Sequence, residues 1–167
     1  PPTERVSASV STGQMLAETR RPLFLLLFAL MWLTAATELA PDQWFAKIMA
    51  DLLPALGSNT ILFLVYTAGL MFVLRQYAAG WLFQRLSPYA ILTGSALLSL
   101  AGLATLGHLS ADAAWAGSAA LLGATLFGVG KTFFWPTMLA ITSEQFPRGG
   151  ALLLNLLGGA GMLSVMV

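Results

Sequence analysis

The chain has 167 residues, of which 57% are hydrophobic and only 9% are charged, and its formal net charge is +1. Soluble domains carry about 25% charged residues, so this composition excludes a soluble enzyme, a nucleic-acid-binding module and a disordered tail. The sequence contains no cysteine, which excludes disulfides and thiolate metal sites. We expect neither a metal nor a cofactor.

Five apolar runs approach the ~20 residues that a helix needs to cross a bilayer. The runs are continuously apolar, unlike the alternating segments of barrel strands. We therefore predict an all-α polytopic membrane protein. Its five transmembrane spans are expected at residues 22–40, 60–74, 89–107, 113–142 and 151–167.

The two ends of the chain suggest that it is an internal piece of a longer protein. The chain begins with Pro1 rather than methionine, and its last apolar run is still unfinished at Val167. Residues 1–19 are small and polar and predict a flexible linker. Residues 20–167 then form one transmembrane bundle.

A short amphipathic segment follows the first span. Pro41 suits the first turn of a helix, where its missing N–H would have no helical partner. Lys47 and Asp51 lie four residues apart on the polar face of the segment. We predict that a new helix starts at Pro41 and that residues 42–53 extend the first span into the membrane interface.

Basic residues are distributed unevenly between the two sides of the predicted bundle. One side has only Lys47, and cytoplasmic loops hold the excess of Lys and Arg. The linker and the connectors at residues 75–88 and 143–150 are therefore predicted to be cytoplasmic, in a multi-pass protein of the cell (inner) membrane. The arginines on this side are Arg5, Arg20, Arg21, Arg75, Arg85 and Arg148.

Two ionisable residues lie within the predicted spans, where each charge costs ~2.5–3.5 kcal/mol on translocon scales. Glu38 is interpreted as a proton-coupling or substrate-binding carboxylate, or else as an interfacial carboxylate that caps the 42–53 segment. Lys131 is interpreted as a residue of the transport pathway, or else as a lysine that reaches the headgroups. Their expected depths differ by roughly 15 Å, so we do not expect them to pair directly.

The fourth span contains features of a deformable helix. Gly128, Gly130 and Pro136 predict a kink, either as a gate or as a bent packing helix. Trp135 lies four residues after Lys131 on the same face. Its ring is either a cavity wall for a ring-shaped ligand or part of the helix packing.

Two polar residues in other spans are further candidates for solute binding. The side chains of Tyr66 and Asn155 could donate hydrogen bonds to a hydroxylated substrate. Helix–helix hydrogen bonding explains them equally well. The sequence leaves both interpretations open.

The connector after the second span, Gly80-Trp-Leu-Phe-Gln-Arg85-Leu-Ser-Pro88, resembles the loop signature G-x-x-x-D-R-x-G-R of the major facilitator superfamily. Gly80 and Arg85 match, whereas Gln84 stands where the family has aspartate. The connector Ser143–Gly150, with Glu144 and a Phe-Pro pair, is similar to a matching loop of the family.

Three further segments carry the resemblance. Residues 128–136 and 155–161 resemble the tenth and eleventh helices of the superfamily. Residues 38–44 are similar to the seventh helix of sugar transporters of the fucose:proton symporter type. The resemblance implies that residues 20–167 are helices seven to eleven of a twelve-helix bundle, with the N-terminal half of the transporter as a missing partner.

The resemblance also implies alternating access around a midplane site between two halves. Arg85 and Glu144 would then form a charge lock between cytoplasmic connectors, although the missing aspartate at Gln84 weakens it. Alternatively, Arg85 is only a topology-setting charge near the headgroups.

The leading hypothesis is a proton-coupled secondary transporter of a small polar solute such as a sugar. Its partners would be that solute, protons and the lipid bilayer, with no nucleic acid. The alternative is a transporter-like scaffold or assembly subunit without cargo. A membrane enzyme is disfavoured, because one histidine and one mid-span lysine do not form a paired catalytic set.

Overall fold

The computed structural model describes residues 10–110, 112 and 114–166. The structure is 85% helical, and no strand occurs in the part of the chain that it describes. Four helical segments are long and apolar enough to cross a membrane. The chain is therefore an all-α membrane protein, as its composition predicts.

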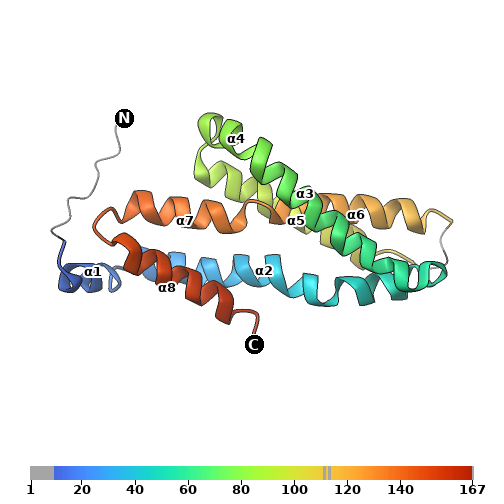
Figure 1. Cartoon of the computed structure of the whole chain (residues 1–167), viewed down its shortest axis with the longest axis horizontal. Coiled ribbons are helices and arrows are strands. Elements are labelled where there is room, and N and C mark those ends of the chain that lie inside the picture. Colours follow the sequence, from blue (N-terminus) through green and yellow to red (C-terminus); the bar gives the residue numbers. More distant parts are fainter. Residues whose placement is uncertain (1–9, 111, 113, 167) are drawn as a thin grey trace. The chain divides into compact units, whose positions relative to one another are not determined.

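The chain forms two compact units. The first unit combines the residues up to Ala36 with those from Trp135 onward, and the second comprises Thr37–Phe134. In chain order the helices are α1 (Thr12–Glu18), α2 (Pro22–Leu52), the 3₁₀ helix η1 (Pro54–Thr60), α3 (Ile61–Tyr77), α4 (Ala79–Arg85), α5 (Pro88–Gly107), α6 (Ala116–Lys131), α7 (Phe134–Gln145) and α8 (Gly150–Leu163) (Figure 1).

The predicted helix start at Pro41 is wrong. Helix α2 runs through Pro41 as one continuous helix of 31 residues (Figure 1). A proline removes only one intrahelical hydrogen bond, and such breaks are tolerated in membrane helices. The buried face of α2 continues across Pro41 at steps of three, four or seven residues, through Phe24, Leu27, Met31, Ala35, Glu38, Phe45 and Met49.

The fourth predicted span, residues 113–142, is interrupted. Helices α6 and α7 are separated by Thr132 and Phe133, and Pro136 lies one turn further on. In an unbroken helix the N–H of residue 136 would donate to the carbonyl of Thr132, and proline has no N–H to give. The interruption therefore falls at the residue that loses its backbone partner.

The two ends of the described chain differ from the prediction. Helix α8 has 14 residues and ends at Leu163, so it extends ~21 Å within the unfinished span that was expected over residues 151–167. Within the expected linker over residues 1–19, Thr12–Glu18 form a helix whose start is closed by reciprocal Ser11–Gln14 hydrogen bonds. Residues 1–9 of that linker lie outside the described residues.

In the first unit, aromatic packing holds the start of α2. The rings of Phe24 and Phe146 meet edge to face with centroids 5.7 Å apart. The Arg21 guanidinium lies 5.3 Å from the centroid of the Phe146 ring, and it also pairs with Glu18 at 2.8 Å. The residues just before α2 are thus tied to the segment that follows α7.

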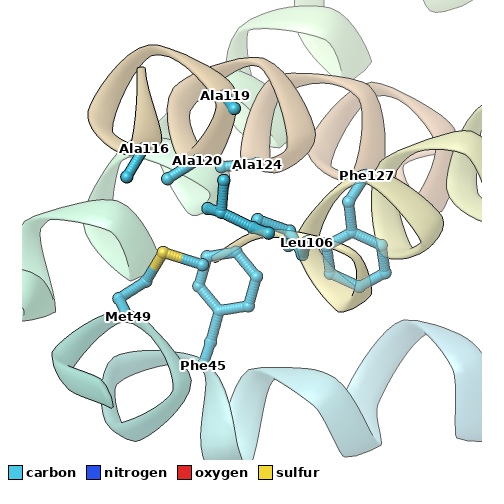
Figure 2. Close-up of a cluster of buried hydrophobic side chains, with 9 residues drawn as sticks. Phe45, Met49, Leu106, Ala116, Ala119, Ala120, Ala124 and Phe127 are labelled. Atoms are coloured by element: carbon cyan, nitrogen blue, oxygen red, sulfur yellow. The ribbon is translucent and has the colours of Figure 1, made fainter. Parts of the chain in front are cut away.

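In the second unit, α2 packs on an alanine-rich face of α6. Figure 2 shows Phe45 and Met49 pointing toward this face and toward Leu106 of α5. The Phe45 ring stacks on the Phe127 ring with centroids 5.9 Å apart. Small side chains allow helices to approach closely in a membrane. The alanines of the face are Ala116, Ala119, Ala120 and Ala124.

Glycines set an even closer contact between α5 and α6. A Cβ atom added to Gly102 would lie 2.4 Å from the backbone nitrogen of Phe127, and one added to Gly130 would lie 2.4 Å from that of Ser99. Real Cβ atoms do not approach other atoms so closely. By contrast, Gly69 and Gly94 have nothing within 4 Å of an added Cβ. Only some of the membrane glycines therefore serve helix packing.

This difference predicts opposite effects for two substitutions on α5. Gly102→Ala forces α5 and α6 apart and is expected to destabilise the protein by ~1–3 kcal/mol. Gly94→Ala meets no neighbour and should be neutral or slightly stabilising, because alanine is the better helix former by ~1 kcal/mol. The midpoint of thermal unfolding in detergent measures both. Equal midpoints for the two variants would contradict the close α5–α6 contact.

Candidate functional site

Two ion pairs join α2 to α3 and α6 in the second unit. The Glu38 Oε1 atom lies 2.9 Å from Nη2 of Arg75. The Lys131 Nζ atom lies 2.5 Å from each carboxylate oxygen of Asp42. All four residues belong to helices that are long and apolar enough to span a membrane.

Each ion pair combines a buried side chain with a more accessible one. The side chain of Glu38 is 6% exposed and that of Arg75 is 35% exposed. The corresponding values are 1% for Lys131 and 26% for Asp42. Burial of a charge is costly unless it is paired, and here each buried charge has a partner of opposite sign. The side chains of Asp42 and Arg75 remain partly exposed.

The continuity of α2 places the two acids together. Glu38 and Asp42 are four residues apart, so they lie one above the other on one helix face. This arrangement requires the helix to pass through Pro41, as it does. The carboxylates then reach two different helices, Glu38 toward α3 and Asp42 toward α6.

Arg75 also reaches the interruption between α6 and α7. Its Nε atom donates a hydrogen bond of 2.8 Å to the carbonyl oxygen of Thr132. This is the carbonyl that Pro136 leaves without a backbone donor. The guanidinium therefore contacts both the carboxylate of Glu38 and the break in the helix, and it connects the charge on α2 to the backbone of the fourth span.

Lys131 lies against an aromatic pair. Its Nζ atom is 5.1 Å from the centroid of the Phe127 ring, close enough for a cation–π interaction. Phe127 in turn stacks on Phe45 of α2. The ammonium group is thus held between a carboxylate and an aromatic face.

Glu38 and Lys131 lie near the middle of their long helices, whereas Arg75 lies in the last turn of α3. Glu38 is residue 17 of the 31 in α2, and Lys131 is residue 16 of the 30 in the span Ala116–Gln145. The neighbouring Gly130 packs against Ser95 and Ser99, which are residues 8 and 12 of the 20 in α5. The span predicted over residues 22–40 would place Glu38 near the end of its helix, whereas α2 continues to Leu52.

Tyr66 is the only further solute-binding candidate placed in the second unit. Its hydroxyl lies 2.9 Å from the Thr125 hydroxyl and joins α3 to α6, as expected of a residue that links helices. Trp135 and Asn155 belong to the first unit. The Trp135 ring rests against Gly161, where an added Cβ would lie 2.8 Å from it, and Asn155 is exposed.

The residues that carry the loop resemblance lie on or near the surface. Gly80 and Gln84 are exposed on α4, and the Arg85 guanidinium lies 5.2 Å from the centroid of the Trp81 ring. Glu144 is exposed on α7 and belongs to the first unit. A charge lock between Arg85 and Glu144 stays a prediction.

Sequence reasoning missed two of the four charges. Asp42 could have been found from its four-residue spacing to Glu38 and from the buried stripe that continues at Phe45. The predicted helix start at Pro41 places Asp42 on a different helix from Glu38 and hides this spacing. Arg75 lies just after the predicted span over residues 60–74, so the sequence pattern indicates only a topology-setting charge there.

Comparison of the chain with models of known protein families, with curated proteins and with solved structures gave no match. In residues 10–110, 112 and 114–166, no group of three or more His, Asp or Glu side chains is arranged to hold a metal ion.

Helix α2 takes part in two lysine ion pairs, the buried Lys131–Asp42 pair and the exposed Lys47–Asp51 pair. Their difference in burial predicts different costs when each lysine is replaced. Lys131→Met leaves Asp42 unpaired and is expected to cost about 3–5 kcal/mol of stability, most of which Asp42→Asn in the same chain should restore. In the Lys47–Asp51 pair both side chains are more than two-thirds exposed, at 67% and 68%. Lys47→Met should therefore cost less than about 1 kcal/mol.

Denaturant unfolding in detergent, followed by circular dichroism, gives these free energies. The double variant separates loss of the pair from loss of lysine packing. A similar small effect of Lys131→Met and Lys47→Met would show that the Lys131–Asp42 pair is not buried in the protein.

Proposed function

We propose that the chain is part of a secondary transporter of the major facilitator type, which moves a small polar solute such as a sugar by alternating access, coupled to protons. The observation that carries this proposal is the two ion pairs, Glu38–Arg75 and Lys131–Asp42, whose buried members Glu38 and Lys131 lie near the middle of apolar helices. Ionisable groups at such positions are rare, and they mark ion and substrate pathways in membrane proteins.

The geometry of the Glu38–Arg75 pair is suited to coupling a proton to a backbone change. A proton that binds a carboxylate oxygen of Glu38 neutralises it and removes the charge that attracts Arg75. Arg75 also donates to the Thr132 carbonyl at the helix break. Protonation on α2 thus alters the balance of contacts at the interruption between α6 and α7.

The Lys131–Asp42 pair is suited to solute binding. The Asp42 side chain is the more exposed member of its pair, so its carboxylate can accept hydrogen bonds from the hydroxyls of a solute while Lys131 holds it in place. Discontinuous helices line the central sites of many transporters. The break at Thr132 lies beside this pair along the chain.

The proposal also covers the bundle as a whole, the linker and the membrane in which the protein lies. Residues 20–167 act as the C-terminal half of the bundle, and the N-terminal half of the same transporter completes the solute path. The linker is cytoplasmic and the protein lies in the cell (inner) membrane, in accordance with the arginine distribution. The proposal assigns no enzymatic step to the chain.

A transporter-like scaffold without cargo is the second candidate. One observation favours it: the two acids and two bases neutralise each other in pairs, as a purely structural lock between helices would require. A scaffold needs no water-filled path to Asp42. Because the chain has no cysteine, Asp42→Cys provides a single labelling site for a membrane-impermeant maleimide.

The decisive experiment reconstitutes the complete protein in liposomes that contain a pH-sensitive dye. A panel of sugars and other small polar solutes is added with and without a proton gradient, and uptake and internal pH are measured. We expect gradient-driven uptake of at least one solute. Absence of uptake across the panel, together with an unlabelled Asp42→Cys variant, would favour the scaffold.

Substitutions then test the two ion pairs. Glu38→Gln should uncouple or abolish uptake because its side chain no longer titrates, whereas Asp51→Asn, at an exposed acid on the same helix, should behave as wild type. Lys131→Ala should abolish uptake while membrane insertion stays normal. Proton-coupled uptake that is unchanged in Glu38→Gln would remove Glu38 from the mechanism.

A further inference from the structure

The second unit contains an apolar cavity apart from the ion pairs. Its volume is about 270 Å³, and residues of α3, α4, α5 and α6 line it. The lining is almost entirely apolar, and apolar cavities do not hold ordered water. Among the lining residues are Leu74, Ala78, Leu82, Ile91, Leu98 and Phe133.

The cavity extends along one half of α5. Its lining on this helix runs from Ala90 to Leu98, that is, from near the N-terminal end at Pro88 to the middle of the helix. This distance is ~12 Å along the helix axis. One leaflet of a ~30 Å hydrocarbon core is ~15 Å deep, so the cavity has the depth of one leaflet.

The end of the cavity at Leu82 and Leu86 is next to a basic residue. Arg85 is exposed at the C-terminal end of α4, and its guanidinium lies 5.2 Å from the centroid of the Trp81 ring. Among the described residues of its own unit, Arg85 makes no ion pair. It can therefore take an anionic partner.

Exposed aromatic residues gather along the chain around Arg85. Tyr77 at the end of α3, Trp81 on α4 and Tyr89 at the start of α5 are 82%, 56% and 54% exposed. Tyr and Trp are enriched at the level of the lipid headgroups. This end of the cavity thus has the composition of a membrane–water interface, and its far end lies at mid-helix.

We propose that the cavity binds one acyl chain of an anionic phospholipid, with the phosphate of that lipid on Arg85. An arginine can bind phosphate through two parallel hydrogen bonds, and the apolar lining accepts the acyl chain. The lipid would hold α4 against α3 and α5. This site uses neither of the two ion pairs, Glu38–Arg75 and Lys131–Asp42.

The test measures lipid binding by the purified full chain. A variant that keeps Trp81 and has phenylalanine at the other four tryptophans is placed in vesicles with brominated phosphatidylglycerol or brominated phosphatidylcholine. Bromine on the acyl chain quenches nearby tryptophan. One basic residue near the surface contributes about 1 kcal/mol of attraction, which predicts about fivefold tighter binding of phosphatidylglycerol.

Matched variants separate the headgroup from the cavity. Arg85→Gln should remove the preference for phosphatidylglycerol, whereas Lys47→Gln, at an exposed lysine on α2, should keep it. Gly94→Leu fills the cavity, because nothing lies within 4 Å of an added Cβ at this lining residue, and should weaken binding of both lipids. Gly69→Leu has equal space on α3 outside the cavity and should bind as wild type.

Native mass spectrometry of the same variants counts the retained lipids and provides a second readout. Retention of phosphatidylglycerol that Gly94→Leu and Gly69→Leu change equally would overturn the proposal. So would quenching without any headgroup preference in the wild type. A chain dimer that Gly94→Leu dissolves would instead assign the cavity to a second copy and would also overturn it.

Discussion

A charge within hydrocarbon must be paired, and this constraint determines the arrangement of the second unit. Glu38 and Asp42 occupy one face of α2, and their partners come from two other helices. A rotation of α2 would leave two acids without bases. The ion pairs therefore set the rotation of α2 about its axis, and the stacked rings of Phe45 and Phe127 set its distance from α6.

Backbone N–H and C=O groups within hydrocarbon must also have hydrogen-bond partners in the protein. Two prolines interrupt the hydrogen bonding of long apolar helices, but with different consequences. Helix α2 continues through Pro41, whereas the fourth span is divided at Thr132 before Pro136. At Thr132 an arginine side chain supplies the missing donor, so an ionic group also serves as a backbone partner. Close glycine contacts, as at Gly102 and Gly130, let α5 support this region.

Some parts of the candidate site could be predicted because they depend on composition alone. Glu38 and Lys131 stand out since charges are rare in apolar runs. Their partners could not be found in this way. Asp42 required knowledge that α2 passes through Pro41, and Arg75 required knowledge that its side chain turns inward rather than toward the headgroups.

The sequence by itself determined the class of the protein, an all-α chain with several helices able to cross a membrane, because hydrophobic length and continuity are local properties. It also limited the chemistry to a few intramembrane charges. Only the tertiary structure decided which acid meets which base, where the fourth span breaks, and which glycines permit contact. Those outcomes depend on the register between helices far apart in the chain, and local pattern contains no information about that register.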